Sequence, residues 1–228
     1  MNIALLLAAG SSSRFEHQQN KLFYCVDEKP LIYYTIKSFQ TSPLVDLIVI
    51  VTKIEYVEEI QKIVQKNNFD KVMHIVLGGK TRQESSFLGL KFVKTLAKDE
   101  DLVLIHDAAR PFVSNQLIEN LINKAATHQA VVPYLKQVET TFVTFDEQTI
   151  GSYLKREKLF RLQTPQVFNL GLIYQAHSKI KKRALSDDSQ ILFRLGKPIY
   201  YIKGEEENLK VTTENDLKLV RQIILEKK

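Results

Sequence analysis

Cysteine and long apolar runs are both scarce in this sequence, and each shortage excludes a class of protein. Cys25 is the only cysteine among 228 residues, so neither an intrachain disulfide nor a metal site built from several cysteines is expected. Such cysteine usage suits a reducing compartment, and we expect a cytoplasmic protein. No apolar run approaches the roughly 20 residues that cross a bilayer, and the N-terminal stretch lacks the basic region of a secretory signal.

What is present describes an ordinary globular chain with a basic surface. Apolar residues make up 44% and charged residues 25% of the sequence, which fits a folded chain rather than a disordered one. The net charge of +6 predicts attraction to polyanions, which include nucleic acids, membrane surfaces and phosphorylated small molecules. The densest basic cluster, at 179–183, is interpreted as a solvated helix end, and no helix-turn-helix, zinc-finger or RNA-binding signature accompanies the charge. The net charge alone does not indicate which of these polyanions is the partner.

Strand-like and helix-like stretches alternate through the first two-thirds of the chain. Four stretches are apolar and rich in β-branched residues, as buried strands are: 3–7, 47–51, 72–77 and 102–106. Four others carry apolar residues at the spacing of helices: 31–39, 56–65, 85–96 and 116–126. This alternation predicts an α/β fold with a mostly parallel, twisted sheet and helices on both faces. In such sheets, ligands bind at loops that leave the carboxyl ends of the strands.

The pattern changes beyond Pro133. Two strand-like stretches, 137–145 and 149–154, are separated by acidic residues and predict a protruding β-arm at about 137–158. Three further elements are predicted: a helix at 170–178, a strand at 199–202 and a helix at 215–225. No linker, repeat or low-complexity stretch interrupts the chain, so we expect residues 1–228 to form a single domain with one arm.

The segment after the first predicted strand has the composition of a phosphate-binding turn. Residues 8–11, Ala-Ala-Gly-Ser, are small enough to let the backbone approach a ligand, and successive amides can hold an anion. Arg14 and Lys21 add positive charge at the same sheet edge. The segment lacks both the P-loop and the glycine-rich dinucleotide fingerprint, which disfavours a nicotinamide-dependent dehydrogenase. A serine-rich turn with two surface cations is the structural alternative.

A second loop leaves the predicted strand at 72–77. Gly78 and Gly79 would let the chain pass beside a flat base, and Ser85 stands where a helix N-cap would. A glycine turn followed by a capping serine explains the same residues without a ligand.

A third loop places an acidic residue directly after the predicted strand at 102–106. Asp107 is a natural magnesium ligand, because Mg²⁺ favours carboxylate and phosphate oxygens. Arg110 lies close enough in sequence to hold Asp107 or to grip a phosphate. The alternative is an Asp–Arg pair that fastens a loop. His106 is interpreted as a packed residue at the strand end.

The last such segment precedes the helix at 215–225. Lys210 can supply a second cation at a reacting phosphate, and Glu207 a further metal ligand. The alternative interprets Lys210 as a surface residue and Thr213 as the N-cap. Each of the four segments is ambiguous by itself, but four of them at one sheet edge favour a site for a nucleotide and its phosphates.

Together these segments resemble the 2-C-methyl-D-erythritol 4-phosphate cytidylyltransferase family over nearly the whole chain and in the same order. The matching motifs are Leu7-Ala8-Ala9-Gly10 with Arg14, Asn20-Lys21-Leu22-Phe23, Gly78-Gly79 with Arg82 and Ser85, His106-Asp107-Ala108-Ala109-Arg110-Pro111, Gln163-Thr164-Pro165-Gln166, Ser186-Asp187-Asp188 and Asn208-Leu209-Lys210-Val211-Thr212. The resemblance implies a Rossmann-like fold whose β-arm forms a homodimer. It also implies transfer of CMP from CTP to the polyol phosphate, in non-mevalonate isoprenoid precursor synthesis, with Mg²⁺ as cofactor.

The same resemblance assigns a role to each matching residue. The nucleotide-binding residues would be Ala8, Ala9, Gly10, Ser11, Gly79, Ser85 and Asp107. The catalytic cations would be Arg14, Lys21 and Lys210. The polyol phosphate would be bound by Arg110, Ser186, Thr140 and Arg156, the last delivered by the arm to the neighbouring subunit. The metal ligands would be Asp107 and Glu207.

Three positions depart from the family pattern. Thr140 aligns with the family's substrate-binding threonine only through a small insertion, Ser186 replaces a threonine, and Glu207 replaces a frequent aspartate. The resemblance predicts CTP and a polyol phosphate as partners, and neither nucleic acid nor a membrane.

Two alternatives stay open from the sequence. A ribitol 5-phosphate cytidylyltransferase shares the fold and motifs, although that family favours Ala-Gly-Gly in the first loop and Ala-Val after the His-Asp pair, where this chain has Ala-Ala-Gly and Ala-Ala. From another class, a basic nucleic-acid-binding protein on a nucleotide-binding fold would bind duplexes with a steep dependence on salt. A specific, magnesium-dependent response to CTP would not show that dependence.

Overall fold

The structure is a computed structural model that describes residues 1–10, 20–180 and 185–226. Its elements follow one another as β1 (Asn2–Leu7), η1 (Lys21–Phe23), β2 (Cys25–Val26), β3 (Lys29–Pro30), α1 (Leu31–Gln40), β4 (Leu47–Thr52), η2 (Ile54–Tyr56), α2 (Val57–Lys66), β5 (Val72–Leu77), α3 (Arg82–Val93), β6 (Leu102–Asp107), α4 (Asn115–His128), β7 (Ala130–Lys136), β8 (Thr141–Val143), β9 (Ser152–Leu154), η3 (Arg156–Lys158), β10 (Phe160–Leu162), β11 (Gln166–Asn169), α5 (Leu170–Lys179), α6 (Ser189–Arg194), β12 (Tyr200–Lys203) and α7 (Glu214–Glu226). None of the helices in these described ranges has the length and apolarity to span a bilayer.

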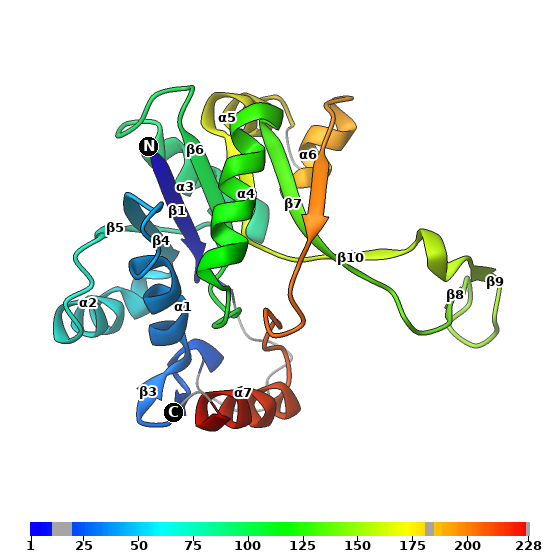
Figure 1. The fold of residues 1–228 in the computed structure, drawn as a ribbon, viewed down its shortest axis with the longest axis horizontal. Coiled ribbons are helices and arrows are strands. Elements are labelled where there is room, and N and C mark those ends of the chain that lie inside the picture. Colours follow the sequence, from blue (N-terminus) through cyan, green and yellow to red (C-terminus); the bar gives the residue numbers. More distant parts are fainter. Residues whose placement is uncertain (11–19, 181–184, 227–228) are drawn as a thin grey trace.

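In the described part of the chain, one eight-stranded sheet organises the molecule (Figure 1). Its strands lie in the order β10-β7-β11-β6-β1-β4-β5, and β12 pairs with β7. β1 runs parallel to β4 and β6, and the β4–β5 and β7–β12 pairs are also parallel. β10 and β11 run antiparallel to their partners. The predicted α/β fold with a mostly parallel sheet is confirmed.

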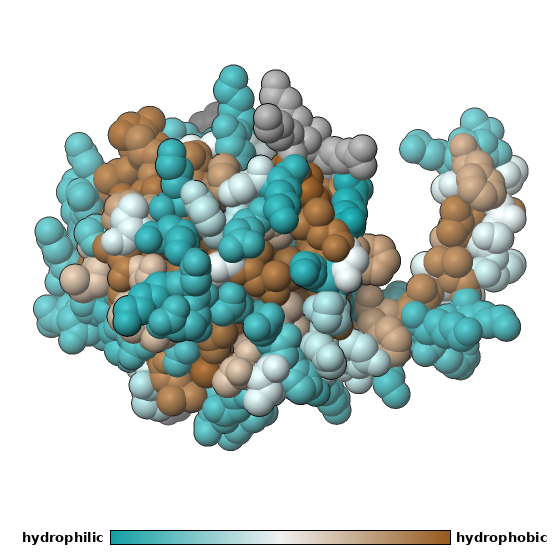
Figure 2. Space-filling view, turned by 90° about the horizontal axis from the view of Figure 1, so that it is seen from above, coloured by the Kyte–Doolittle hydropathy of each residue, from teal (hydrophilic) through white to brown (hydrophobic). Residues whose placement is uncertain are grey.

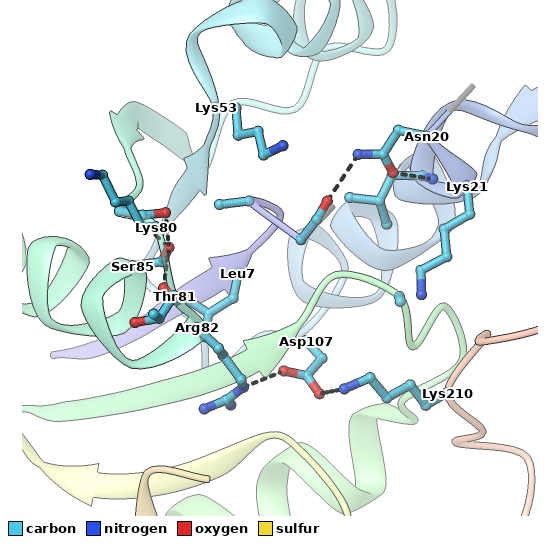
Figure 3. Close-up of a pocket in the computed structure, with 15 residues that line it drawn as sticks. Leu7, Asn20, Lys21, Lys53, Lys80, Thr81, Arg82, Ser85, Asp107 and Lys210 are labelled. Carbon is cyan, nitrogen blue, oxygen red and sulfur yellow. Dashed lines mark hydrogen bonds and ion pairs between the residues drawn. The ribbon is translucent and has the colours of Figure 1, made fainter. Parts of the chain in front are cut away.

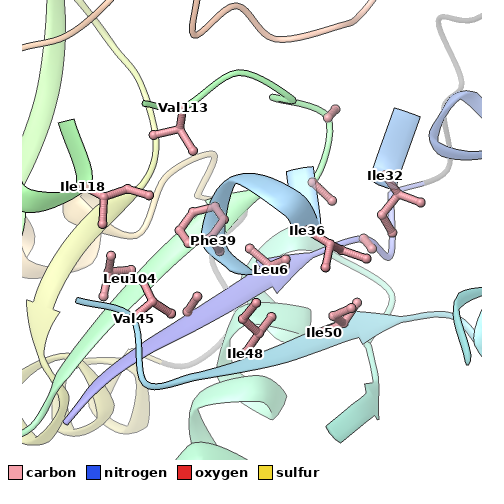
Figure 4. Packing of buried hydrophobic residues seen from close by; sticks show 14 of the residues in the cluster. Leu6, Ile32, Ile36, Phe39, Val45, Ile48, Ile50, Leu104, Val113 and Ile118 are labelled. Atoms are coloured by element: carbon pink, nitrogen blue, oxygen red, sulfur yellow. The ribbon is translucent and has the colours of Figure 1, made fainter. Parts of the chain in front are cut away.

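The sheet has an apolar core on each face because side chains alternate between faces along a strand. In β1, Leu6 belongs to the cluster that α1 and α4 cover, while Leu5 belongs to the cluster that α3 and α5 cover. Figure 4 shows Leu6 packed beside Ile36 and Phe39 of α1, which are fully buried. Truncating a buried phenylalanine such as Phe39 to alanine costs about 3–5 kcal/mol. Packing on both faces holds the strands in place, and therefore also the sheet edge at which the parallel strands end.

An arm projects from the sheet between β7 and β10 (Figure 1). β8 and β9 pair only with each other, as a two-stranded antiparallel ribbon. The paired strands are shorter than the stretches 137–145 and 149–154 that the sequence predicts. Figure 2 shows apolar residues gathered along this arm. Phe145, between β8 and β9, is 85% exposed.

Four elements of the sheet and its cover were not predicted from the sequence: β7, β10, β11 and α6. Gln166 begins β11, which pairs with both β6 and β7. Gln166 is fully buried. Because its side chain is polar, a search for apolar runs does not detect it as an interior residue. Its polar partners, rather than hydrophobicity, set its place in the interior.

Candidate active site

The carboxyl ends of three parallel strands meet at one edge of the sheet. Leu7, the last residue of β1, is paired with Val51 of β4 on one side and with Asp107 of β6 on the other. A cavity of about 560 Å³ opens at this edge (Figure 3). Seven of the predicted site residues line it: Ala9, Gly10, Lys21, Gly79, Ser85, Asp107 and Lys210. Four sequence segments that are far apart along the chain therefore contribute to one site.

Asn20 fastens the end of the first loop. Its side-chain amide donates to the carbonyl of Gly10 at 3.2 Å, and its side-chain oxygen accepts from the amide of Leu22 at 3.1 Å. It thereby caps η1 and sets Lys21 at the mouth of the cavity, where Figure 3 shows the ammonium pointing toward Asp107 and Lys210. Ala8 lies below the cavity and donates to the carbonyl of Val51 at 2.7 Å. Ser11 and Arg14 lie outside the described residues.

The glycine turn between β5 and α3 is held by Ser85 from inside the helix. The hydroxyl of Ser85 accepts from the amide of Gly79 at 3.1 Å and donates to the carbonyl of Thr81 at 2.9 Å. The prediction that Ser85 is the N-cap is wrong, because Thr81 caps α3 by accepting from the amide of Glu84 at 3.1 Å. The serine supports the turn instead of starting the helix. The turn itself approaches the first loop so closely that a Cβ on Gly78 would lie 2.7 Å from Cβ of Ala9.

Asp107 lies at the centre of the cavity floor between two cations. Oδ1 accepts from Nε of Arg82 at 3.1 Å, and Oδ2 accepts from Nζ of Lys210 at 2.7 Å. Figure 3 shows the two cations approaching the carboxylate from opposite sides. Burial alone would raise the pKa of Asp107, but the charges of Arg82 and Lys210 outweigh it and hold the pKa well below its usual range. Asp107 is therefore an anion at every physiological pH.

The segment that carries Lys210 is fastened by Arg110. Nη1 of Arg110 donates to the carbonyl of Asn208 at 2.7 Å, and the side-chain amide of Asn208 donates to the carbonyl of Thr164 at 2.8 Å. Arg110 is buried, and burial lowers its pKa without removing its charge. The structure does not bring Arg110 to the cavity wall, where the sequence placed a substrate contact. It fastens the loop beneath the site through the carbonyl of Asn208, whereas the ion pairs of Asp107 in the described residues are with Arg82 and Lys210 and not with Arg110, as the alternative had it.

His106 is a packed strand-end residue, as predicted. Its Nε2 donates to the carbonyl of Arg110 at 3.0 Å, and its Nδ1 accepts from the hydroxyl of Thr164 at 3.1 Å, roles that we assign from the partners. Complete burial lowers the pKa of His106 to about 4, so the ring is neutral near pH 7. It has no access to the cavity.

Four other predicted residues do not line the cavity in this chain. Thr140 and Arg156 lie on the exposed arm, and Ser186 is an exposed residue that accepts from the side-chain amide of Gln190 at 3.2 Å. Glu207 is exposed and lines a second cavity of about 1040 Å³ instead. The prediction that Glu207 joins Asp107 as a metal ligand is not supported, because Glu207 does not line the cavity that contains Asp107.

The cavity contains residues that the sequence analysis did not name as site residues. The polar ones among them are Asn20, Lys53, Lys80, Thr81 and Arg82. Lys53 directly follows β4, so the rule that ligands bind beyond strand ends would have found it. Arg82 stands within a matching motif, but nothing local shows that its side chain reaches two different acids.

A magnesium ion at this cavity would have one carboxylate as a ligand. Asp107 is the only acidic residue among the described residues that line the cavity, and no group of three acidic, histidine or cysteine residues forms a metal site in the described ranges. Mg²⁺ commonly takes one or two carboxylates and completes its octahedron with substrate phosphates and water. The permanently ionised Asp107 fits that donor set with a bound triphosphate.

Known proteins are similar to this chain over almost its whole length. Residues 2–227 match the model of the 2-C-methyl-D-erythritol 4-phosphate cytidylyltransferase family. Proteins of that name from Clostridium botulinum and Clostridium acetobutylicum are 39% and 40% identical to this chain. The first alignment covers 98% of this chain and 97% of the relative, and the second covers 95% and 94%.

Solved structures agree with the sequence comparisons. The crystal structure of 4-diphosphocytidyl-2C-methyl-D-erythritol synthase from Anaerococcus prevotii superimposes with a TM-score of 0.83 at 26% identity, over 98% of this chain and 96% of that one. The fold, the cavity at the strand ends and these likenesses lead to one conclusion: the chain belongs to the 2-C-methyl-D-erythritol 4-phosphate cytidylyltransferase family.

Proposed function

We propose that this protein transfers CMP from CTP to 2-C-methyl-D-erythritol 4-phosphate and releases pyrophosphate. The observation that carries the proposal is the convergence of Lys21, Arg82 and Lys210 with Asp107 at one cavity beside the glycine turn. Such a set matches a triphosphate, whose charge requires several cations and whose metal requires a carboxylate.

The chemistry needs cations more than it needs a base. A phosphate oxygen of the polyol phosphate attacks the α-phosphorus of CTP, and the bond from that phosphorus to the bridging oxygen of the β-phosphate breaks. A phosphate monoester is largely ionised near neutral pH, because its second pKa is about 6, so no side chain has to remove a proton. Negative charge develops on the reacting phosphate and on pyrophosphate. Catalysis then rests on positioning and on electrostatic stabilisation.

Each described residue has a part in this scheme. Gly79 and Ser85 form the turn against which the base lies, and Ala9 and Gly10 present backbone amides to the phosphates. Lys21 and Lys210 stabilise the charge on the reacting phosphate and its leaving group. Asp107 would hold Mg²⁺, which when bound draws the phosphate oxygens together and neutralises part of their charge.

The polyol phosphate needs contacts that this chain's cavity does not provide alone. Arg156 is on the arm with 59% of its side chain exposed, and its ion pair with Glu157 is long at 3.6 Å. We propose that the arm pairs two copies of the chain and carries Arg156, with Thr140 nearby, to the partner's cavity. The exposed aromatic residues of the arm, Phe145 and Tyr153, favour such a contact.

A pyrophosphate-release assay tests the proposal. Purified protein is supplied with CTP and Mg²⁺ and either 2-C-methyl-D-erythritol 4-phosphate or ribitol 5-phosphate. We expect release with the first polyol and far less with the second. Faster release with ribitol 5-phosphate would change the substrate, and release with neither would refute the proposed reaction.

A further inference from the structure

Asp188 is a buried carboxylate at the start of α6 that accepts hydrogen bonds from three donors. Nη1 of Arg82 lies 2.6 Å from Oδ2, while Oγ of Ser86 and Nε2 of His177 lie 2.6 Å and 3.0 Å from Oδ1. The side chain is 1% exposed, and it does not line the cavity. A buried carboxylate is costly unless it is paired, so these donors must compensate its desolvation.

Arg82 connects this buried carboxylate to the cavity floor. Its Nη1 is held by Asp188, and its Nε is bonded to Oδ1 of Asp107 at 3.1 Å. The guanidinium is planar and rigid, so fixing one edge of it fixes the direction of the other. Asp188 thereby sets the position of Arg82, and Arg82 sets one oxygen of Asp107 while Lys210 takes the other.

The elements around Asp188 make it a rigid anchor. Ser86 comes from α3 and His177 from α5, and the ring of His177 stacks on Phe87 with centroids 5.8 Å apart and planes 4° from parallel. The neighbouring Asp187 accepts from the side-chain amide of Gln166 on β11 at 2.6 Å. Two helices and a sheet strand therefore fix the loop that contains Asp188.

The charges of this chain of groups are permanent. Burial alone would raise the pKa of Asp188, but the Arg82 charge and the hydrogen bonds from His177 and Ser86 lower it below its ordinary value. For Arg82, burial would lower the pKa, but Asp188 and Asp107 together raise it. The ion pairs are therefore present at the pH of catalysis.

We propose that Asp188 is a positioning residue for nucleotide transfer: it fixes Arg82, and through Arg82 it orients Asp107 and Lys210 toward the bound phosphates. The inference rests on the proposed function, because it assigns a task within the same site. A displacement of about 1 Å in such a constellation can cost on the order of 100-fold in rate.

A double-mutant cycle between Asp188 and Arg82 tests this. The variants are Asp188→Asn, Arg82→Lys and the double variant, assayed for pyrophosphate release with CTP and the polyol phosphate. Lysine keeps the charge of Arg82 but cannot bridge two carboxylates. We expect Asp188→Asn to lower kcat about 10- to 100-fold with a smaller change in KM for CTP, and to have little further effect once Arg82 is lysine.

Two further variants keep the test decisive. Asp101→Asn removes a carboxylate that pairs with the N-terminus at the opposite edge of the sheet, and it should leave kcat unchanged. If Asp188→Asn does not fold, Ser86→Ala removes one donor to the same carboxylate and should give a smaller fall in kcat that also disappears in Arg82→Lys. A fall in kcat that is equally large in both Arg82 backgrounds would overturn the proposal, as would an unchanged kcat in the folded variant.

A spectroscopic measurement separates this proposal from the proposed reaction. In ¹⁵N NMR, the Nε–H signal of Arg82 is assigned by its loss in Arg82→Lys. In the wild type, the proton on Nε should exchange slowly with solvent. The signal should broaden or shift strongly in Asp188→Asn and be unchanged in Asp101→Asn. If the wild type turns over neither polyol phosphate while this signal behaves as expected, the proposed function fails but the coupling stands. If Asp188→Asn leaves this signal unchanged, the proposed coupling between Asp188 and Arg82 is refuted.

Discussion

Lys21 and Lys210 reach the cavity from opposite ends of the chain. Nζ of Lys210 is bonded to Asp107, and η1 carries Lys21 beside the first loop. Both ammonium groups are positioned before any substrate arrives, as electrostatic catalysis requires.

We predict that Lys21→Ala and Lys210→Ala fold normally but lose turnover by about 100- to 1,000-fold, since removing one well-placed donor costs about 3–4 kcal/mol of transition-state stabilisation. KM for CTP should change less. Steady-state kinetics with thermal melting would check this, and Lys62→Ala, which removes an exposed lysine of α2, is the control. Near-normal rates in both variants would remove these lysines from the catalytic role.

Asp188 also makes a prediction about stability. Its pKa in the folded protein is below the unfolded value of about 3.9. The folded state therefore binds fewer protons than the unfolded state between these two pKa values. The stabilisation from the carboxylate is complete above about pH 4 and is lost as the pH falls toward the folded pKa.

Asp188→Asn should accordingly lower the free energy of unfolding by about 3–5 kcal/mol at pH 7, because it removes the more deeply buried of the two carboxylates that pair with Arg82. This difference from the wild type should shrink as the pH falls below about 4. Urea unfolding at a series of pH values measures it. A difference that stays constant down to pH 3 would mean that ionisation of Asp188 contributes nothing.

At the scale of elements, the contact between the first loop and the glycine turn controls the shape of the nucleotide site. An added Cβ at Gly78 would lie 2.9 Å from Oγ of Ser85 as well as 2.7 Å from Cβ of Ala9, so both elements would have to move. The first loop and the glycine turn line the same cavity.

We predict that Gly78→Ala raises KM for CTP by about tenfold and lowers stability by about 1–3 kcal/mol, because the overpacked turn shifts. Asn169→Ala is a suitable control, since Asn169 caps α5 by accepting from the amide of Leu172 at 2.9 Å. Losing that cap costs about 1 kcal/mol of stability without touching the cavity. An unchanged KM in Gly78→Ala would show that the turn tolerates the displacement.

At the scale of the whole molecule, the arm between β7 and β10 is the feature that predicts assembly. In the described part of the chain, β8 and β9 pair with each other and with no strand of the eight-stranded sheet, and Phe145, between them, is 85% exposed. A two-stranded ribbon is at best marginally stable alone in water. We therefore expect a second copy of the chain to cover it.

If the site is shared between subunits, two inactive variants should restore each other. Mixing Lys210→Ala with Arg156→Ala and refolding together gives heterodimers with one intact site. Random pairing predicts about a quarter of wild-type activity. Each variant alone should remain nearly inactive, and analytical ultracentrifugation should show dimers throughout. If the mixture is no more active than its components, Arg156 does not act in the partner's cavity.

The sequence by itself determined the fold class and most of the cavity. Buried strands such as 102–106 are recognised by their continuous apolar runs, and the rule that ligands bind beyond strand ends points to the loops after them. Asp107 and Lys210 follow from that rule together with the motifs that resemble the family. These signals depend on residues that are near one another in the sequence, so they can be recognised without the structure.

Only the tertiary structure decided which polar groups meet. That Arg82 joins Asp107 to Asp188, and that Arg110 lies under the site rather than in it, depends on partners up to 106 residues away in the sequence. The interior positions of Gln166 and Asp188 likewise follow from hydrogen bonds and not from hydrophobicity. Polar contacts are directional and long-range in sequence, so no local pattern of residue types specifies them.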